Sequence, residues 1–201
     1  MFGFRKPINM RLKRSFFVRP TLTVAKELLG KYLARKIGRK ILIGKIVETE
    51  AYIGPKDKAS HAFDWKITPR NNPEYLEGGR IYIYLVYGMY WQFNVVTAGV
   101  GKPECVLIRA LEPVDFLRSD LPRRSDLANG PGKLCRWLKL DKSFDSEDLT
   151  KSKRIWIEDR GEKIKKPRIV ATERVGIDYA QEWAQKPWRF YIKESSFVSR
   201  K

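Results

Sequence analysis

The sequence predicts a single mixed α/β domain of the α+β class, built around antiparallel strands. Short apolar segments typical of strands follow one another with turn residues between them, and few segments carry helix signals. About 43% of the 201 residues are hydrophobic, which is enough for a packed core. The chain has no internal repeat and no linker long enough to divide it. We therefore expect one domain over residues 19–201, preceded by a basic, flexible arm at residues 1–18.

The elements are expected where turn residues and prolines punctuate the chain. Thr23 is the expected N-cap of a first helix and Gly30 its stop. Pro131 stands near the first position of a second helix, where proline is favoured. Strands are expected at residues 32–37, 40–49, 80–86, 91–97, 104–111, 154–158 and 188–192. Polar, turn-rich segments at 54–79, 121–129 and 141–153 predict loops or, at 121–129, a short helix.

The clearest strand signal lies at residues 80–86, where apolar side chains alternate with Tyr82 and Tyr84. Gly88 follows in a short turn, so the chain is expected to return as the second strand of a hairpin. Tyr87 then lies at the hairpin tip. A large aromatic side chain at an exposed tip lowers solubility, which indicates that it inserts into a partner.

The charge of the chain indicates a polyanionic partner. The sequence has 41 Lys and Arg against 23 Asp and Glu, a net charge of +18. Lysine and arginine bind nucleic acids through release of condensed counterions. An anionic membrane is the competing partner, but no long basic amphipathic helix supports it. No signal peptide is recognisable, and no apolar run approaches the roughly 20 residues of a membrane span. We therefore expect an intracellular protein.

Metal and disulfide chemistry have little support in the composition. Cys105 and Cys135 do not form a CxxC pair, and His61 is the single histidine. These are too few soft ligands for a structural zinc site, and a disulfide framework is not expected. His61 falls in a loop whose neighbours do not mark it as a metal ligand.

Two carboxylates near the end of an apolar strand are the first candidates for chemistry. In an extended chain Glu48, Glu50 and Tyr52 share one face. A strand that becomes polar as it leaves the core explains them without function. A carboxylate at this position also suits a general base that activates water. Alternatively, both glutamates together with Asp57 suit a metal-dependent nuclease.

Aromatic and basic residues add a second set of candidates. Aromatic faces stack on bases, with about 1–3 kcal/mol per base, although tyrosine is also a common strand residue. The tyrosines concerned are Tyr52, Tyr82, Tyr84, Tyr87 and Tyr90. Arg109 interrupts an apolar strand and is expected to pair with a carboxylate or to face a groove. Lys133 at a helix start is either a phosphate contact or a solvated surface residue.

Taken together, these segments resemble the alkyladenine (3-methyladenine) DNA glycosylase family. The resemblance runs in the same order along the chain from about Arg19 to the C-terminus. The segments are 47–55 (VETEAYIGP), 59–61 (ASH), 68–71 (TPRN), 81–90 (IYIYLVYGMY), Asn94, 106–113 (VLIRALEP), 130–134 (GPGKL), 142–145 (KSFD) and 174–177 (RVGI).

The resemblance implies a role for individual residues. Glu50 is similar in position to the general base of the family. Tyr52, His61 and Tyr84 correspond to the walls that sandwich an extruded base. Tyr87 corresponds to the wedge that fills the gap left in the DNA stack.

Further roles follow from the same resemblance. Asn94 matches an asparagine that rejects the exocyclic amine of guanine, and Arg109 an arginine near the catalytic water and the DNA backbone. Arg70 and Lys133 are candidates for backbone contacts. Glu48 is expected to be structural, with the strand bending or bulging there. Glycosylases of this family use no metal or organic cofactor.

The resemblance also implies the fold and the reaction. The fold is a curved antiparallel sheet with flanking helices and a protruding hairpin that inserts into DNA. The activity is monofunctional: alkylated or deaminated purines are flipped out of double-stranded DNA and their N-glycosidic bond is hydrolysed. We expect a monomer without an obligate protein partner, acting in a nucleoid or nucleus. A nuclease and a passive nucleic-acid-binding module are the alternatives.

Overall fold

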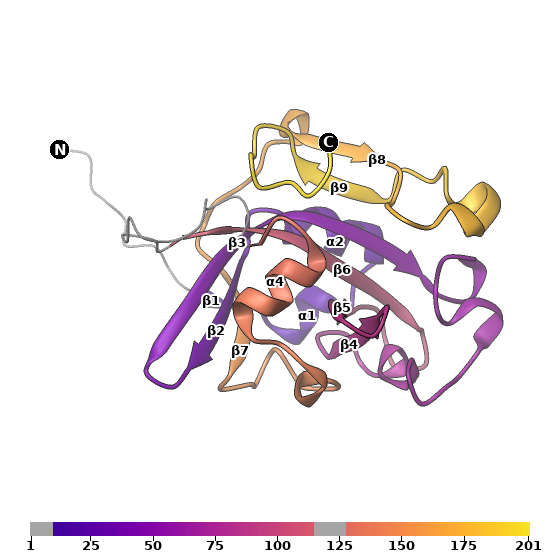
Figure 1. The fold of residues 1–201 in the computed structure, drawn as a ribbon, viewed down its shortest axis with the longest axis horizontal. Helices are drawn as coiled ribbons and strands as arrows, with labels where there is room; N and C mark the ends of the chain where they lie inside the picture. The colour runs from indigo at the N-terminus through magenta and orange to yellow at the C-terminus, as the bar shows by residue number, and fades with distance from the viewer. Residues whose placement is uncertain (1–9, 115–127) are drawn as a thin grey trace.

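An antiparallel sheet of nine strands organises the computed structural model, which describes residues 10–114 and 128–201 (Figure 1). The strands are β1 (Met10–Arg11), β2 (Tyr32–Ile37), β3 (Lys40–Ile53), β4 (Ile81–Val86), β5 (Tyr90–Val96), β6 (Glu104–Pro113), β7 (Ile155–Asp159), β8 (Ile169–Thr172) and β9 (Arg189–Ile192). Seven of them follow the order β1-β7-β2-β3-β6-β5-β4, and β8 and β9 join through β3. The predicted fold class, one mixed domain around antiparallel strands, is confirmed.

The long strand β3 connects the parts of the sheet. Its first half pairs with β2, from Tyr32 opposite Lys45 to Ile37 opposite Lys40. Residues 48–50 pair with β9, and almost the whole strand pairs with β6 along its opposite edge. In Figure 1, β3 runs across the molecule and the β8–β9 pair lies beside its second half. One edge of β3 therefore pairs with β2 and with the C-terminal strand β9, and the other edge pairs with β6.

Three helices accompany the sheet in the described ranges: α1 (Arg14–Phe17), α2 (Thr21–Leu28) and α4 (Pro131–Leu138). Helix α2 packs on β3 and β6, and α4 packs on β5 and β6. Short 3₁₀ turns occur at η1 (Gly54–Lys56), η2 (Phe63–Trp65), η3 (Asn72–Tyr75), η4 (Lys142–Phe144), η5 (Lys166–Arg168) and η6 (Asp178–Trp183). None of the helices within 10–114 and 128–201 is long and apolar enough to cross a bilayer.

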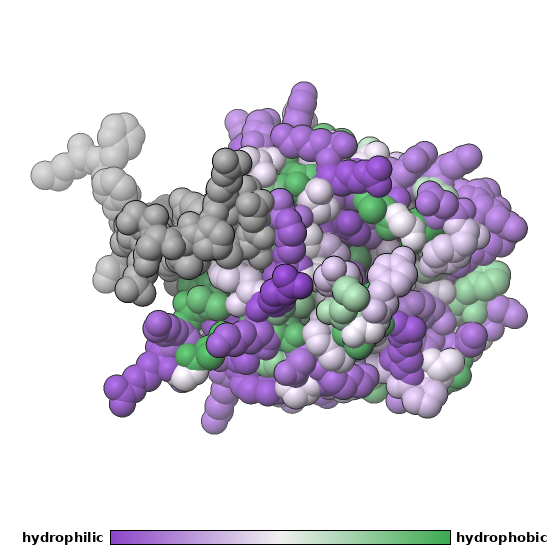
Figure 2. Space-filling model, in the orientation of Figure 1, coloured by the Kyte–Doolittle hydropathy of each residue, from purple (hydrophilic) through white to green (hydrophobic). Residues whose placement is uncertain are grey.

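The largest core contains side chains from all three of these helices and from most strands. Val24 and Leu28 of α2 and Leu134 and Leu138 of α4 are completely buried in it. The visible face in Figure 2 is largely hydrophilic, with many side chains extending outward. Apolar side chains thus fill the core, and basic side chains remain at the surface.

The start of α2 differs from the prediction. Thr23 is not the N-cap: the helix begins at Thr21, after Pro20, and the Thr23 N–H already donates to the Pro20 carbonyl at 2.9 Å. The proline, with φ of −51°, is preset for the residue before a helix. Gly30 does follow the end of the helix, with φ of +81°, a backbone conformation that favours glycine.

The N-terminal arm is also shorter than predicted. Residues 10–18 are part of the domain, because Met10 and Arg11 pair with β7 and Phe17 is completely buried in the core. The basic residues misled the prediction, since Arg14 donates to the carbonyl of Gly78 and pairs with Asp148 instead of remaining in solvent. Residues 1–9 lie outside the described ranges, as does the loop or short helix expected at 121–129 up to residue 127.

Candidate active site

A cavity of about 540 Å³ opens between the β4–β5 hairpin, β6, the loop around His61 and the segment 175–179. This volume lies within the roughly 300–1,000 Å³ typical of pockets for small molecules. Seven predicted site residues line it: Tyr52, His61, Arg70, Tyr84, Tyr87, Asn94 and Arg109. Glu50 lies behind this lining, and Lys133 is not part of it. Residues distant in sequence therefore meet as predicted around one hollow.

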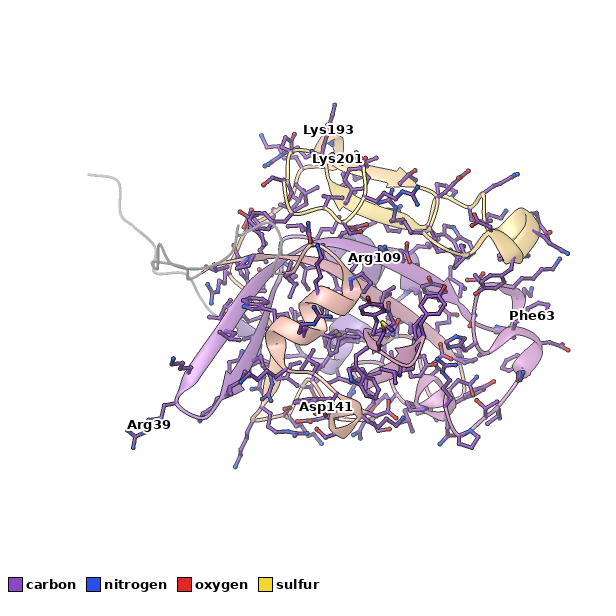
Figure 3. All side chains as sticks on the ribbon, in the orientation of Figure 1. Arg39, Phe63, Arg109, Asp141, Lys193 and Lys201 are labelled. Carbon is purple, nitrogen blue, oxygen red and sulfur yellow. The ribbon has the colours of Figure 1, made fainter. Side chains whose placement is uncertain are left out.

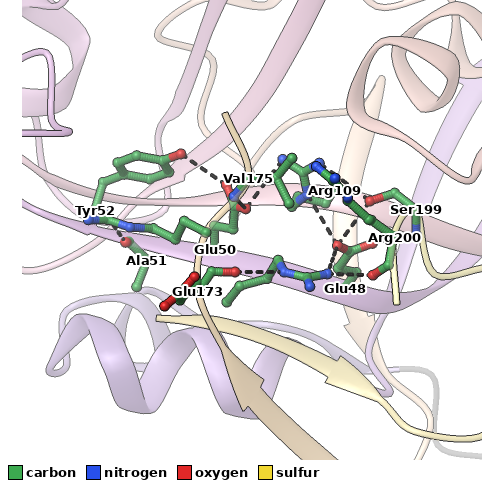
Figure 4. Close-up of polar contacts among 11 residues, drawn as sticks. Glu48, Glu50, Ala51, Tyr52, Arg109, Glu173, Val175, Ser199 and Arg200 are labelled. Carbon is green, nitrogen blue, oxygen red and sulfur yellow. Dashed lines mark hydrogen bonds and ion pairs between the residues drawn. The ribbon is translucent and has the colours of Figure 1, made fainter. Parts of the chain in front are cut away.

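Glu50 is completely buried, and its carboxylate is held by three cavity-lining residues (Figure 4). The Tyr52 hydroxyl donates to Oε2 at 2.9 Å and the Val175 N–H donates to Oε1 at 2.8 Å. The Arg109 guanidinium lies 3.3 Å from Oε1. Because Oε2 accepts one hydrogen bond from the described residues, it retains a lone pair for a further donor.

Tyr52 and Arg109 keep the protonation states that this arrangement requires. Burial and the neighbouring Glu50 raise the pKa of the Tyr52 phenol well above its usual value, so the hydroxyl remains a donor. Burial opposes the charge of Arg109, but Glu50 and Glu48 outweigh it and raise the pKa of the guanidinium. The Glu50 carboxylate thus contacts the charged guanidinium of Arg109 and the protonated phenol of Tyr52.

Glu48 lies beside Glu50 on β3, and Arg109 contacts both carboxylates. The predicted bulge is confirmed: the β3–β6 register shifts on both sides of Glu48, which pairs with Ala110, while Thr49 pairs with Ile108. The irregularity leaves Arg109 without a partner in the ladder.

Glu48 is tied to the C-terminal segment. Its Oε1 lies 2.9 Å from Nη1 of Arg189 and its Oε2 accepts the Ser199 N–H at 2.6 Å. Two arginines and a backbone amide thus occupy its carboxylate, which is completely buried. The structural role predicted for Glu48 fits these contacts.

The contacts of Asp57 bear on the nuclease alternative. Arg174 binds it through both terminal nitrogens, at 2.5 and 2.9 Å, and both side chains are inaccessible to solvent. Glu48 and Glu50 share Arg109. Each of the three carboxylates in the nuclease alternative therefore forms an ion pair with an arginine. The described residues contain no cluster of three or more ligands suited to a metal ion.

Aromatic rings form one wall of the cavity. The rings of His61 and Tyr84 meet edge to face with centroids 4.6 Å apart, and Tyr82 lies 5.0 Å from Tyr84. Nδ1 of His61 and the Tyr82 hydroxyl share a hydrogen bond of 2.6 Å. Tyr82 also lines the cavity, is only 1% exposed and contacts the rings of both His61 and Tyr84. These contacts fix the orientation of the ring faces that border the cavity.

Asn94 is buried on β5 at the same cavity. Its amide nitrogen donates to the carbonyls of Tyr82 and Gln92, both at 3.2 Å. The Cys105 thiol lies 3.8 Å from its amide oxygen. The side chain is thereby held in one orientation.

Tyr87 lies at the tip of the β4–β5 hairpin and is 86% exposed. The predicted turn is confirmed: the Met89 N–H donates to the Val86 carbonyl at 3.1 Å. Tyr87 and Gly88 both have positive φ, 52° and 68°, as a tight hairpin turn requires. Tyr87 therefore exposes a large aromatic side chain to solvent and has a left-handed backbone conformation. For a residue other than glycine this conformation is unfavourable.

The two basic candidates, Arg70 and Lys133, lie near the hairpin and have different contacts there. Arg70 donates to the Leu85 carbonyl at 2.5 Å and stacks on Tyr84, 5.0 Å from the ring centroid. Lys133 is exposed at the start of α4 and donates to Asn129 at 2.8 Å. A Cβ at the neighbouring Gly132 would lie 2.8 Å from the Tyr90 ring, so glycine lets α4 approach the hairpin closely.

Several residues that complete the site carried no signal in the sequence. Val175 contributes only its backbone N–H, and Ser199 lies in a polar segment near the C-terminus that has no recognisable motif. In Figure 3, Arg109 lies in the interior between the hairpin and the C-terminal strands. Contacts of this kind depend on tertiary approach and are invisible to local patterns.

Comparison with known proteins identifies the family. The family profile of methylpurine-DNA glycosylases matches residues 15–196, which is most of the chain. The chain belongs to this family. The human DNA-3-methyladenine glycosylase is 40% identical over 204 residues, which cover 94% of this chain and 68% of the human protein. The mouse DNA-3-methyladenine glycosylase is 42% identical over 205 residues, covering 94% of this chain and 61% of the mouse protein.

The family assignment confirms the predicted resemblance and the enzyme class. Members are DNA glycosylases, hydrolases that act on N-glycosyl bonds and serve DNA repair. A bacterial relative from Natranaerobius thermophilus, classed by its name with the 3-methyladenine DNA glycosylases, is 43% identical over 197 residues. The match covers 94% of this chain and 99% of that protein. The similarity thus extends over nearly the whole domain, including every segment around the cavity.

The single histidine offers a direct test of the pocket. Burial, followed by the charges of Arg70 and Lys66, lowers the pKa of His61 to about 4. We expect its NMR signals to titrate with a midpoint near 4. Since the pKa in the folded state lies below the unfolded value of about 6.5, the stability due to neutral His61 is present above pH 6.5 and lost as the pH falls toward 4. A midpoint near 6.5 would contradict this burial.

Proposed function

We propose that the chain is a monofunctional DNA glycosylase that flips alkylated or deaminated purines out of double-stranded DNA and hydrolyses their N-glycosidic bond. One observation carries the proposal: the buried Glu50 carboxylate is bound by Tyr52, Val175 and Arg109, which all border a cavity of purine-compatible size. A carboxylate so placed is a general base at the edge of a base-binding pocket.

In the proposed reaction Glu50 accepts a proton from a water molecule, whose oxygen attacks C1′ of the sugar. The bond between C1′ and the purine nitrogen breaks, and its electron pair leaves with the base. Alkylation makes the purine a better leaving group, so one carboxylate and one water suffice. Arg109 keeps Oε1 occupied and so favours proton transfer to Oε2, on which a lone pair is available. The product is an abasic site.

The hairpin and the aromatic wall support base flipping. A base inside the duplex cannot be reached, so it must rotate into a pocket, at a cost in unstacking of a few kcal/mol. The exposed ring of Tyr87 is placed to fill the gap in the DNA stack. Tyr52, His61 and Tyr84 then stack against the extruded purine, and Asn94 rejects the guanine amine. An aromatic site also attracts the positive charge of many alkylated purines.

The remaining features of the proposal concern DNA contact and cellular setting. A net charge of +18 favours binding to the DNA backbone irrespective of sequence. Arg70 and Lys133, both close to the hairpin, contribute to this contact. We propose that the enzyme works inside the cell as a monomer, without an obligate protein partner, and that Glu50 needs no cofactor to activate water.

Replacing the general base tests the proposal. Glu50→Gln keeps the shape of the side chain but removes its basicity. We expect single-turnover release of purine from a lesion duplex to fall by roughly 100- to 10,000-fold, the usual contribution of general base catalysis, while binding of the same duplex is retained. The reactions contain a chelator and are scored for abasic sites, because a metal-dependent nuclease would instead be inactivated or make direct strand breaks.

A second glutamate on the neighbouring strand provides the control. Glu112 of β6 pairs with Lys45, away from the cavity lining. Glu112→Gln is expected to release base at the wild-type rate. Near-normal release by Glu50→Gln would show that the base is misassigned. A wild-type protein that binds DNA without turnover would indicate a passive binding module.

The wedge assignment predicts a selective effect on binding. Tyr87→Ala should weaken binding to lesion duplex by about 1–3 kcal/mol, the range for aromatic stacking on bases, and weaken binding to undamaged duplex less. Ile41→Ala is the matched control, since Ile41 is an exposed apolar residue on the separate β2–β3 hairpin. If Tyr87→Ala lost the same binding free energy on both duplexes, Tyr87 would be a surface contact and not a wedge.

A further inference from the structure

The proposed reaction leaves one buried carboxyl of the cavity without a role. Glu74 lies in η3, on the loop that precedes β4, and is only 1% exposed. It lines the same cavity as Tyr84 and Asn94. The sequence suggested a solvated loop here, so a buried acidic side chain at this position is unexpected. Its place in the lining makes it a candidate for contact with the extruded base.

The hydrogen bonds of Glu74 are incomplete. Its Oε1 accepts from the Cys105 thiol at 3.3 Å. Its Oε2 is buried and finds no hydrogen-bond partner among the described residues. Nearby Arg70 donates to the Leu85 carbonyl and stacks on Tyr84, so it does not form an ion pair with Glu74. A buried polar oxygen without a partner is costly unless something else satisfies it.

Burial and a second carboxylate, that of Asp57, oppose ionisation of Glu74. Together they raise the pKa of Glu74 to about 8, although the Cys105 hydrogen bond lowers it. At neutral pH the side chain is therefore mostly a carboxylic acid, with one hydroxyl donor and one carbonyl acceptor.

Two other polar side chains of the cavity lining are already engaged. Asn94 donates to two backbone carbonyls, and His61 shares a hydrogen bond with the Tyr82 hydroxyl. Oε2 of Glu74 thus differs from these groups in having its hydrogen-bonding capacity free. A neutral acid in a pocket with an aromatic wall is suited to donate to an acceptor atom on a purine.

We propose that Glu74 is a specificity-determining residue, whose free Oε2 hydrogen-bonds the edge of the extruded purine and favours neutral bases with an acceptor there, such as a keto oxygen, over cationic bases. The inference rests on the proposed function, and it adds the substrate class. Deaminated purines carry a keto oxygen and no charge, whereas ring-methylated adenines such as 3-methyladenine are cationic and carry an amine in place of that oxygen.

The preference depends on pH. Below about 8 the neutral acid donates to the base, and above it the carboxylate repels acceptor atoms and attracts a cation. The other titratable groups around η3 do not change charge in this range. On β4 and β6, burial raises the pKa values of Tyr82, Tyr84 and Cys105 far above their usual values, and in the loop the pKa of His61 is lowered to about 4. Arg70 lines the same cavity, and Asp57 forms an ion pair with Arg174.

The test compares two duplexes that differ in one base, hypoxanthine or 3-methyladenine. Single-turnover rates of base release are measured from about pH 6 to about pH 9, on both sides of the Glu74 pKa of about 8. For the wild type we expect the hypoxanthine-to-3-methyladenine rate ratio to fall by about tenfold across this range, as expected for one hydrogen bond. Ratios within one protein cancel differences in folded fraction between variants.

Two substitutions separate the hydrogen bond from the charge. Glu74→Gln keeps a donor and an acceptor but cannot ionise, so its ratio should lack the pH dependence that Glu74 gives to the wild-type ratio. Glu74→Leu lacks the donor, so its ratio should be about tenfold lower than that of the wild type at low pH. Ionisation of the substrate bases affects all proteins alike and cancels in the comparison. Glu77→Gln, at a half-exposed side chain three residues away, should behave as the wild type.

The outcomes distinguish this inference from the proposed function. If the wild type releases both bases but its ratio is independent of pH, or if Glu74→Gln shows the same pH dependence as the wild type, the role of Glu74 is overturned. The same holds if Glu74→Leu leaves the ratio unchanged. If the wild type releases neither base, the glycosylase proposal itself fails, and the assignment of Glu74 falls with it.

Discussion

The site depends on the ion pairs that Arg109 forms with Glu48 and Glu50. Two completely buried carboxylates on one strand repel each other, and burial of each charge is costly unless cations compensate it. Arg109 lies between them, with Nε 3.2 Å from Glu48 and Nη1 3.3 Å from Glu50. The bulge in the β3–β6 ladder is what brings the guanidinium to both glutamates.

Glu48 and Glu50 share Arg109 but differ in their other contacts. Glu48 is surrounded by Arg109, Arg189 and the Ser199 amide, which ties the C-terminal segment to the sheet. Glu50 has a lone pair left on Oε2 and lies directly behind the cavity lining. Two similar residues, two positions apart, thus differ in the hydrogen bonds that their carboxylates can still accept, because their neighbours differ.

The cavity beside Glu50 is assembled from segments far apart in the chain. The hairpin supplies Tyr84 and Tyr87, the long loop supplies His61 and Glu74, and the segment after β8 supplies the Val175 amide. Glu50 is completely buried and Arg109 is only 8% exposed, which strengthens the electrostatic interaction between their charges. The exterior is basic, which suits the DNA on which members of this family act.

Much of the fold could be predicted because the local signals agreed with the global structure. The alternation before Tyr87 and the glycine after it fixed the hairpin, and Pro131 marked α4. Strand β8 was missed because its short apolar run follows a strongly basic stretch, and its partner β9 lies about twenty residues later. Thr23 was misplaced because Pro20 starts the helix earlier.

The site was predictable only where chemistry and family resemblance marked it. The residues around the cavity were found from their motifs, and the structure brings most of them together. Glu74 was missed because an acidic residue among turn formers normally faces solvent. Only the packing of η3 on β4, β5 and β6 buries it. No local pattern encodes such a tertiary contact, nor the approach of the Ser199 amide to Glu48.

The central claim is that Arg109 acts on the reaction through the Glu50 carboxylate. A double-mutant cycle tests it most directly, with single-turnover base release measured for Glu50→Gln, Arg109→Met and the double variant. If the two residues work as one unit, the double variant releases base no more slowly than Glu50→Gln alone. If the two losses multiply, Arg109 acts independently of Glu50 and the account is contradicted.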